Sequence, residues 1–537
     1  MALTPASQNA GPAPVARRGP EPLWLIGALA AVVAVLPLAG VVAAALSGGA
    51  ADIAGRDLIR YAATSVSLAG LVAVITAVLG SAAAWLVVMH RFPGRDVFAW
   101  ALALPFAMPA FAMAYAYSDL FDVAGELRTW LRATAGFDLP VQMRSLWGAG
   151  FVLGLAFFPY VYLAMRAAFV NLPVQALEAA RSLGASPRRA FLGVALPMAR
   201  PALAAGVALA VMETLADFGA VQFLSVQTLT TGVVRAWFVY GSLASAAQFA
   251  LPLLGAAALL LWVERASRRR RSYGTNGGKW RPLPVTDLGG ARGWMAMTYC
   301  LTLVTLGLLL PAGWLAWTSM DVTPDWPRLI GAARNSVFLG VAGAAVTVTL
   351  AAALALSARR FPLTARIASL GYATPGAVMA IGLLLPAAWL WSVVPGGSAN
   401  AAAGIALLLY AYAARLMAAA LEPVDAGLSR VTPSMIQAAR GLGAGETGAA
   451  LRVQLPIAAP ALFTAGLVVL IDVLKELPAT LILRPFNFDT LAVMADNYAR
   501  DERLANAGWP SLILVGLALP AVLWLSRKIT HARPGSP

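Results

Sequence analysis

The sequence is poor in the residues that cross-link chains, bind soft metals or cover a water-soluble surface. It has one cysteine, Cys300, and two histidines among 537 residues, which excludes an intramolecular disulfide framework and a thiolate metal cage. Only 12% of the residues are charged, whereas soluble globular domains contain about a quarter. A soluble globular protein is therefore excluded, and the single cysteine says nothing about the redox compartment.

The chain is instead rich in long apolar runs. Hydrophobic residues make up 60% of it, and its mean hydropathy is +0.75. A helix of roughly 20 apolar residues crosses about 30 Å of hydrocarbon. Runs of about this length predict twelve transmembrane helices, at 23–46, 61–89, 97–118, 147–170, 201–221, 244–263, 294–318, 335–357, 367–391, 401–421, 459–482 and 508–526. We therefore expect an all-α polytopic membrane protein.

The distribution of charge predicts the orientation of these helices. The net charge is +15, and with both termini in the cytoplasm the Lys and Arg residues concentrate in the cytoplasmic segments, as the positive-inside rule requires. The basic run 268–271 is then a topology anchor in contact with lipid headgroups, and we expect no nucleic-acid partner. The first apolar run is too long for the core of a cleaved signal peptide, so we interpret it as an uncleaved span.

The chain also contains an internal duplication. Three short motifs recur: RFP at 91–93 and 360–362, PAFAMA at 109–114 and PGAVMA at 375–380, and LPMARPAL at 196–203 and LPIAAPAL at 455–462. We expect two parallel six-helix units, because an even number of crossings gives both copies one orientation. The predicted divisions are a tail at 1–22, a first unit at 23–264, a linker at 265–293, a second unit at 294–526 and a tail at 527–537.

Two polar segments interrupt the apolar pattern at equivalent places, at 171–200 in the first unit and 430–458 in the second, and we call them elbow 1 and elbow 2. In elbow 1, Gly184 breaks a helical pattern, and Ser186 followed by Pro187 is typical of the start of another helix. Pro197 is expected to end that second helix. The sequence therefore predicts a helix, a sharp turn and a helix.

The elbows resemble the cytoplasmic loop of the membrane-spanning subunits of bacterial ABC importers. That loop has the form Glu-Ala-Ala, three residues, Gly, nine residues, an aliphatic residue, one residue and Leu-Pro. Elbow 1 fits throughout, with Glu178, Ala179, Ala180, Gly184, Val194, Leu196 and Pro197. Elbow 2 fits at all but the first position, with Gln437, Ala438, Ala439, Gly443, Val453, Leu455 and Pro456. The resemblance implies a type I ABC importer in the bacterial inner membrane.

In that family the loop docks on a separate ATP-binding subunit, and its small residues allow close packing. The resemblance implies that Glu178 makes a polar contact with this partner, whereas Gln437 lacks the charge, so the two elbows need not be equivalent. No phosphate-binding loop is present, because Gly277-Gly278-Lys279-Trp280 lacks the first glycine and the hydroxyl residue that the motif requires. ATP and Mg are therefore expected in a partner, in two copies for the two elbows, with no cofactor bound by this chain. The alternative is an ordinary amphipathic surface loop.

Four carboxylates fall within predicted spans, where an ionisable group costs roughly 2.5–3.5 kcal/mol on insertion scales and normally faces protein or water. Glu213 and Asp217 in the first unit correspond to Asp472 and Glu476 in the second. Each pair lies on one helix face, so the four are candidates for a cation path, with Tyr115 and Tyr160 as further candidates. Alternatively, they satisfy backbone groups and arginines such as Arg166 and Arg415 at kinked helix ends, and the tyrosines serve packing.

Over most of its length the chain resembles the fused two-unit permeases for ferric iron, notably at 217–238 and 475–492. The resemblance implies a periplasmic iron-binding protein and a homodimeric ATPase. The expected dock for the binding protein is formed by segments 119–146, 222–243 and 484–506, because they are the longest on the periplasmic side and carry mixed charge. Permeases for thiamine, phosphonates or polyamines remain open. From other classes, so do an ion-coupled secondary transporter and, more remotely, a membrane enzyme. No dedicated metal site is expected, although oxygen ligands suit a hard cation.

Overall fold

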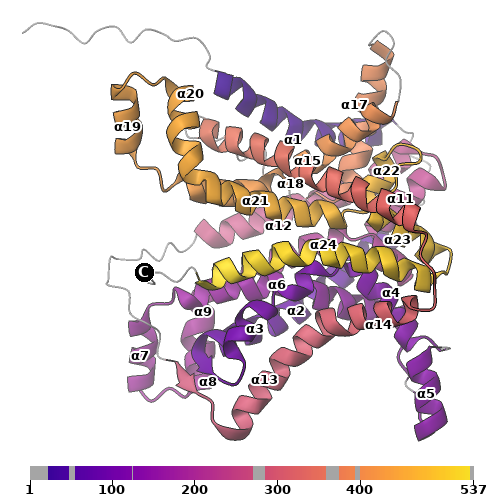
Figure 1. Ribbon diagram of the computed structural model, residues 1–537, viewed down its shortest axis with the longest axis vertical. Helices are drawn as coiled ribbons and strands as arrows, with labels where there is room; N and C mark the ends of the chain where they lie inside the picture. Colours follow the sequence, from indigo (N-terminus) through magenta and orange to yellow (C-terminus); the bar gives the residue numbers. More distant parts are fainter. Residues whose placement is uncertain are drawn as a thin grey trace, which may run out of the picture.

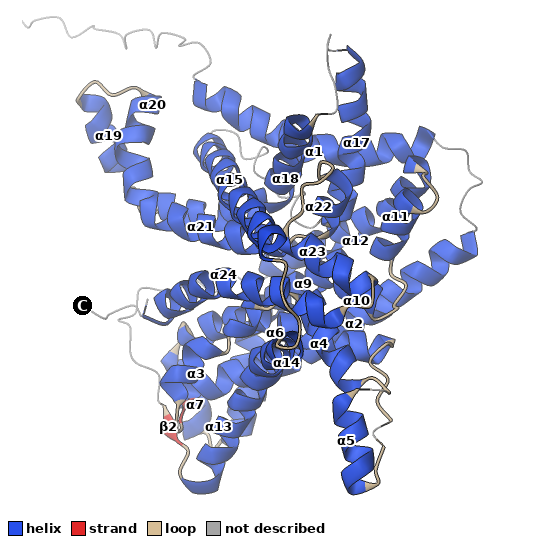
Figure 2. Ribbon diagram, turned by 45° about the vertical axis from the view of Figure 1, so that its right-hand side comes forward, coloured by secondary structure: helices blue, strands red, loops and turns tan. Residues whose placement is uncertain are grey.

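The computed structural model describes residues 22–47, 55–123, 125–138, 140–269, 285–358, 374–393 and 400–531, and these are overwhelmingly helical (Figures 1 and 2). The first half contains α1 (Pro22–Ser47), α2 (Gly55–Met89), α3 (Arg95–Ala101), α4 (Ala110–Phe121), α5 (Glu126–Ala135), α6 (Leu146–Val170), α7 (Val174–Ser182), α8 (Pro187–Ala190), α9 (Leu196–Ala216), α10 (Gly219–Phe223), α11 (Leu229–Phe238) and α12 (Leu243–Arg269). The second half contains α13 (Gly290–Val304), α14 (Leu310–Ser319), α15 (Trp326–Ala358), α17 (Gly376–Val393), α18 (Ala401–Leu428), α19 (Pro433–Gly441), α20 (Glu446–Ala449), α21 (Leu455–Lys475), α22 (Pro478–Leu483), α23 (Leu491–Arg500) and α24 (Leu504–His531).

Within the described residues, eleven helices are long and apolar enough to cross a membrane, or twelve if one bent pair counts as a span. That pair corrects the straight span predicted at 97–118. Its two parts meet at 89°, because a short 3-10 turn, Leu104–Ala107, and Pro109 at the start of α4 interrupt helical hydrogen bonding. The predicted tail at 1–22, the motif at 360–362 and much of the linker lie outside the described residues.

The duplication is visible in the secondary structure as well as in the sequence. The helices α7, α8 and α9 begin and end 259 positions before α19, α20 and α21, as Val174 and Pro433 illustrate. A buried hydrogen bond is also repeated: Ser65 Oγ accepts from the backbone N–H of Leu229 at 2.9 Å, and Ser336 Oγ accepts from that of Leu491 at 2.8 Å. In both halves, a serine in a long helix, α2 or α15, is thus bonded to the first residue of a short helix, α11 or α23.

The first helix of each half packs against the other half. α1 lies against α15, α17 and α18 of the second half, and also against α12 of its own half. α13 lies against α2 and α3 of the first half, and α14 lies between α4 of the first half and α24 of its own (Figure 1). Two glycines allow α1 to approach α17 closely. A Cβ added to Gly40 would lie 1.9 Å from the carbonyl oxygen of Gly382, and one added to Gly382 would lie 2.0 Å from that of Pro37. Backbone therefore meets backbone where these helices cross.

A short parallel strand pair, which the all-α expectation did not include, joins the linker to the first half. β1 (His90–Arg91) pairs with β2 (Thr286–Asp287), and the Leu288 N–H donates to the Arg91 carbonyl at 2.9 Å. Arg181 in elbow 1 donates to Thr286 Oγ1 at 3.1 Å. Burial, followed by the charges of Arg181 and Arg95, lowers the pKa of His90 below its ordinary value, so its imidazole is neutral beside these arginines at neutral pH.

The crossing of α1 and α17 leads to a prediction about stability. Replacing Gly382 with Ala should lower the free energy of unfolding by about 1–3 kcal/mol, because the added methyl overpacks a backbone contact. The measurement is the unfolding midpoint of the purified protein in detergent. The matched control is Gly466→Ala in α21, where a Cβ meets nothing within 4 Å and the change should be neutral or stabilising. Equal midpoints for the two variants would contradict the close crossing.

Candidate functional site

The two elbows project from the same side of the molecule, α7 with α8 from one half and α19 with α20 from the other (Figure 1). The start of α1 and the end of α24 lie on this side too. In elbow 1, Ser186 caps the second helix as predicted, since its Oγ accepts from the Arg189 N–H at 3.4 Å. In elbow 2 the corresponding helix starts at Glu446, which pairs with Arg440 at 3.2 Å.

A glycine makes the turn in each elbow for a conformational reason. Gly184 and Gly443 have φ angles of +79° and +88°, in the left-handed region that side chains with a Cβ adopt at a cost. A Cβ at either position would meet nothing within 4 Å, so close packing inside this chain is not what requires a glycine there. The backbone N–H groups of Gly184 and Gly443 donate to the carbonyls of Arg181 and Arg440, both at 2.9 Å, and close the preceding helices.

The prediction that Pro197 ends the second helix of elbow 1 is wrong. A five-residue π-helical stretch, Phe191–Ala195, leads directly into α9, and Pro197 lies in the first turn of α9. The same arrangement precedes Pro456, with a π-helical stretch at Ala450–Gln454. The wider turn accommodates a residue that has no N–H and whose ring would clash with the preceding turn of an α-helix. Each elbow is therefore continuous with a long membrane helix.

The tip of each elbow presents one large, exposed apolar side chain. Leu183 is 87% exposed and Leu442 is 90% exposed. Glu178 and Ala179 are exposed beside the first tip, and Gln437 and Ala438 beside the second, while Ala180 and Ala439 are half-buried. Large apolar side chains this exposed are typical of a surface that binds another protein. The residues singled out by motif thus lie on a matched pair of candidate docking surfaces.

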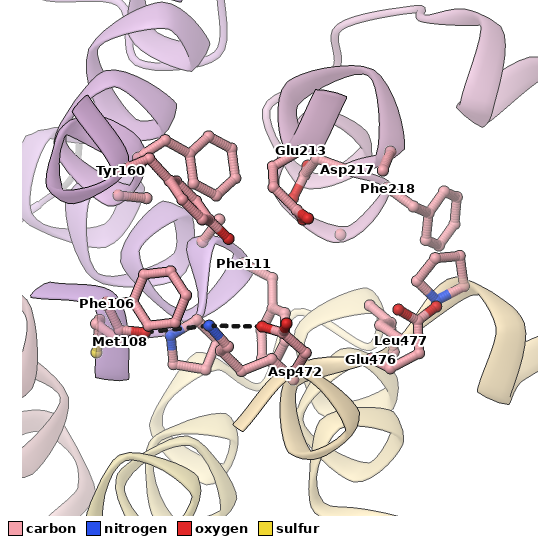
Figure 3. A pocket seen from close by; sticks show the side chains of 18 of the residues that line it. Phe106, Met108, Phe111, Tyr160, Glu213, Asp217, Phe218, Asp472, Glu476 and Leu477 are labelled. Atoms are coloured by element: carbon pink, nitrogen blue, oxygen red, sulfur yellow. Dashed lines mark hydrogen bonds and ion pairs between the residues drawn. The ribbon is translucent and has the colours of Figure 1, made fainter. Parts of the chain in front are cut away.

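The second candidate site is a cavity of about 80 Å³ between the two halves (Figure 3). Its lining comes from five places in the chain: the turn between α3 and α4, then α6, the junction of α9 and α10, α18, and the junction of α21 and α22. All four carboxylates from the predicted spans line it, namely Glu213, Asp217, Asp472 and Glu476. Figure 3 places Glu213 and Asp217 across the cavity from Asp472 and Glu476.

Two of these carboxylates cap broken helices. α9 ends at Ala216, short of the predicted 221, and Asp217 Oδ1 accepts from the Val221 N–H in α10 at 3.0 Å. α21 ends at Lys475, and Glu476 Oε1 accepts from the Ala479 N–H in α22 at 3.1 Å. Satisfying backbone groups at a kinked helix end is the alternative that the sequence left open for the four carboxylates, and it holds for these two.

Two cations from the second half complete the cluster. Arg415 in α18 forms an ion pair with Glu476 and approaches Glu213 Oε2 to 3.5 Å. Lys475 lies 3.8 Å from Asp472 Oδ1, donates to the Phe106 carbonyl at 3.1 Å and lies 3.9 Å from the centre of the Phe106 ring. Four carboxylates and two cations leave a formal charge of −2 around a small space inside the membrane-spanning part of the protein.

Some predicted partners do not reach this cavity. Among the residues the structure describes, Arg415 and Tyr160 line it, whereas Arg166 and Tyr115 do not. Tyr115 is buried against Phe223, with ring centres 4.7 Å apart, as a packing residue would be. The Phe106 carbonyl was not predicted, because a backbone acceptor at a helix break leaves no mark in the side-chain pattern.

Comparison with known proteins shows that the sequence of this chain is similar to those of transport permeases. Residues 76–273 match the family model of the binding-protein-dependent transport system inner membrane component. The Fe(3+)-transport system permease protein FbpB 2 of Haemophilus influenzae is 26% identical over 81% of this chain and 83% of that protein.

Two further relatives match one part of the chain. The putative 2-aminoethylphosphonate transport system permease protein PhnU of Salmonella choleraesuis is 30% identical over 39% of this chain and 78% of its own length. The sulfate transport system permease protein CysT of Escherichia coli is 35% identical over 31% of this chain and 58% of its own length. Of these three, only the iron permease matches a stretch long enough to include both halves.

The unequal burial of the two partners of Arg415 predicts unequal costs of removing them. Glu476→Ala should lower the free energy of unfolding by about 3–5 kcal/mol, because it leaves a buried guanidinium without its nearest partner. Glu213→Ala should cost about 1 kcal/mol, since the Glu213 side chain is 27% exposed against 4% for Glu476. Unfolding midpoints in detergent measure both, with the exposed Asp57→Ala as control. A larger effect at Glu213 would contradict the assigned pairing.

Proposed function

The chain belongs to the family of binding-protein-dependent transport system inner membrane components, and we propose that it carries ferric iron into the cytoplasm as the permease of an ATP-driven importer. Permeases of this family work with an ATPase and a substrate-binding protein. The proposed partners are two copies of an ATP-binding subunit, one for each elbow, and a periplasmic iron-binding protein. ATP hydrolysis takes place on the partner, and both termini lie in the cytoplasm, on the side of the elbows.

The observation that carries the choice of iron is the charge of the central cavity. Its four carboxylates outnumber Arg415 and Lys475, so the site attracts cations and repels sulfate or phosphonate. Carboxylate and carbonyl oxygens are the ligands that a hard cation such as Fe³⁺ prefers. The iron permease relative, which aligns across both halves, supports the same choice. Thiamine and polyamines are also cationic, and the experiment below separates them.

The proposed mechanism is alternating access driven through the elbows. ATP brings the two partner subunits together, and the exposed tips at Leu183 and Leu442 move with them. Because each elbow continues into α9 or α21 without a break in the helix, movement of an elbow is transmitted to the end of that helix, where the carboxylates lie. The two halves then rock and open the cavity to the outside, and hydrolysis returns them.

The surface opposite the elbows is the proposed dock for the binding protein. Figure 1 shows α5, α11 and α23 on that side, and these helices lie within the segments 119–146, 222–243 and 484–506. Several aromatic side chains are exposed there, among them Trp130, Phe238, Tyr240 and Phe486. Exposed aromatic residues amid mixed charge are typical of protein interfaces.

The substrate is tested by uptake in cells with this gene deleted and restored. Restoration should return uptake of radiolabelled ferric ion at least about tenfold above the deletion strain, because electrostatic complementarity favours a polyvalent cation. Thiamine, putrescine and sulfate uptake are measured alongside. Restored thiamine or putrescine uptake with unchanged iron uptake would show that the substrate is that cation and not iron. Uptake sustained by a proton or sodium gradient after ATP depletion would instead indicate an ion-coupled secondary transporter.

The elbows are tested through their glycines. The double variant Gly184→Val, Gly443→Val should abolish ATP-driven uptake while the protein stays inserted, since a β-branched residue at positive φ distorts each turn. Membrane fractions show insertion, and uptake assays show function. Gly290→Val is the matched control, because Gly290 also has a positive φ, +58°, and open space around it, but lies outside the elbows. Normal transport by the double variant would contradict the coupling role.

A further inference from the structure

We propose that Arg415 is an ionic latch that holds the two halves together across the central cavity and closes the path to small cations. The inference rests on the proposed function, in that it treats the cavity as part of a cation path. Arg415 is anchored in the second half by its ion pair with Glu476. Its second contact, with Glu213 at 3.5 Å, crosses to the first half. One guanidinium therefore bridges the surfaces that must separate when the cavity opens.

The latch is asymmetric, although the carboxylates around it are not. The repeat relates Glu213 to Asp472 and Asp217 to Glu476, 259 positions apart. The same offset relates Arg415 to Ala156 and Lys475 to Ala216, and both alanines line the cavity. Acids are thus present in both copies, whereas both cations come from the second half. At the two equivalent positions, the first half has alanines in place of cationic residues.

Lys475 reinforces the bridge at a second point. Its ammonium group contacts the Phe106 carbonyl and ring, and both belong to the first half. The two cations of the second half therefore both reach across the cavity. The side chain of Arg415 is 11% exposed and that of Glu213 is 27% exposed, so the contact between them is only partly shielded from water and can be broken when the cavity opens.

The latch also occupies the position of the cargo. A cation entering the cavity competes with Arg415 for Glu213, so entry and release of the bridge are coupled by charge. The carboxylates outnumber the cations by two in formal charge, which allows a polyvalent cation to replace the guanidinium at Glu213 without leaving that carboxylate unpaired. The closed state is therefore held by a tethered cation, and the transported one displaces it.

The test measures passive entry of Mn²⁺ into calcein-filled liposomes that contain the full-length protein, without ATPase or ATP. Wild type should admit little Mn²⁺. Arg415→Gln, which keeps hydrogen-bond donors near Glu476 but removes the charge, should raise the rate about five- to tenfold as a minor open state becomes populated. Glu213→Gln weakens only the contact of Arg415 with the first half and should also raise the rate of Mn²⁺ entry. Arg328→Gln, in an exposed ion pair outside the cavity, is the control and should match wild type.

A variant that moves the arginine to the first half distinguishes a latch from an arginine that only stabilises the fold. In the double variant Ala156→Arg, Arg415→Gln, the repeat places the new guanidinium near Asp217 and Asp472, again bridging the halves. Mn²⁺ entry should fall back to within about twofold of wild type, because the pairing is restored in mirror order. Folding of every variant is checked by size-exclusion chromatography.

Two outcomes would overturn the latch. One is wild-type Mn²⁺ entry in both folded single variants, Arg415→Gln and Glu213→Gln. The other is a relocated arginine that leaves the leak of Arg415→Gln in place. Because the assay needs neither iron nor ATP, failure of the iron assignment in cells leaves its result unaffected, and the reverse also holds.

Discussion

Backbone polar groups inside a bilayer must find partners within the protein, since hydrocarbon offers none, and this constraint governs the centre of the molecule. α9 and α21 each end at a break in the helical hydrogen bonding, and a short helix, α10 or α22, follows. Asp217 and Glu476 take over hydrogen bonding at the two breaks by accepting from Val221 and Ala479. The same carboxylates bring negative charge into the cavity, so the device that permits the break also determines what the cavity attracts.

The repeat explains which features are paired and which are not. Both copies have the serine bonds at Ser65 and Ser336, the positive φ of Gly184 and Gly443, and a capping acid at the end of the long helix. Features that serve the single central path need only one copy. Arg415 and Lys475 are of this kind. The protein is therefore two-fold in its scaffold and asymmetric where the halves meet.

Much of this arrangement could be predicted from sequence because membrane insertion and duplication both leave strong one-dimensional signals. Apolar length located the long helices, and the repeated motifs located the elbows and the four carboxylates. The failures have a common cause. The bend near Pro109, the passage of a helix through Pro197 and the exclusion of Tyr115 from the cavity depend on local backbone geometry or packing that residue types do not encode. The exchange of α1 and α13–α14 between the halves is likewise a property of tertiary contacts.

That exchange affects the order in which the protein can assemble during synthesis. α1 leaves the ribosome well before α15, which it packs against and which begins at Trp326, and before α17, which begins at Gly376. Its glycine-lined face meets Gly382 of α17, so this contact forms only after all of the first half and part of the second have been translated and inserted. The nascent chain therefore passes through a stage in which α1 is inserted without its main partner.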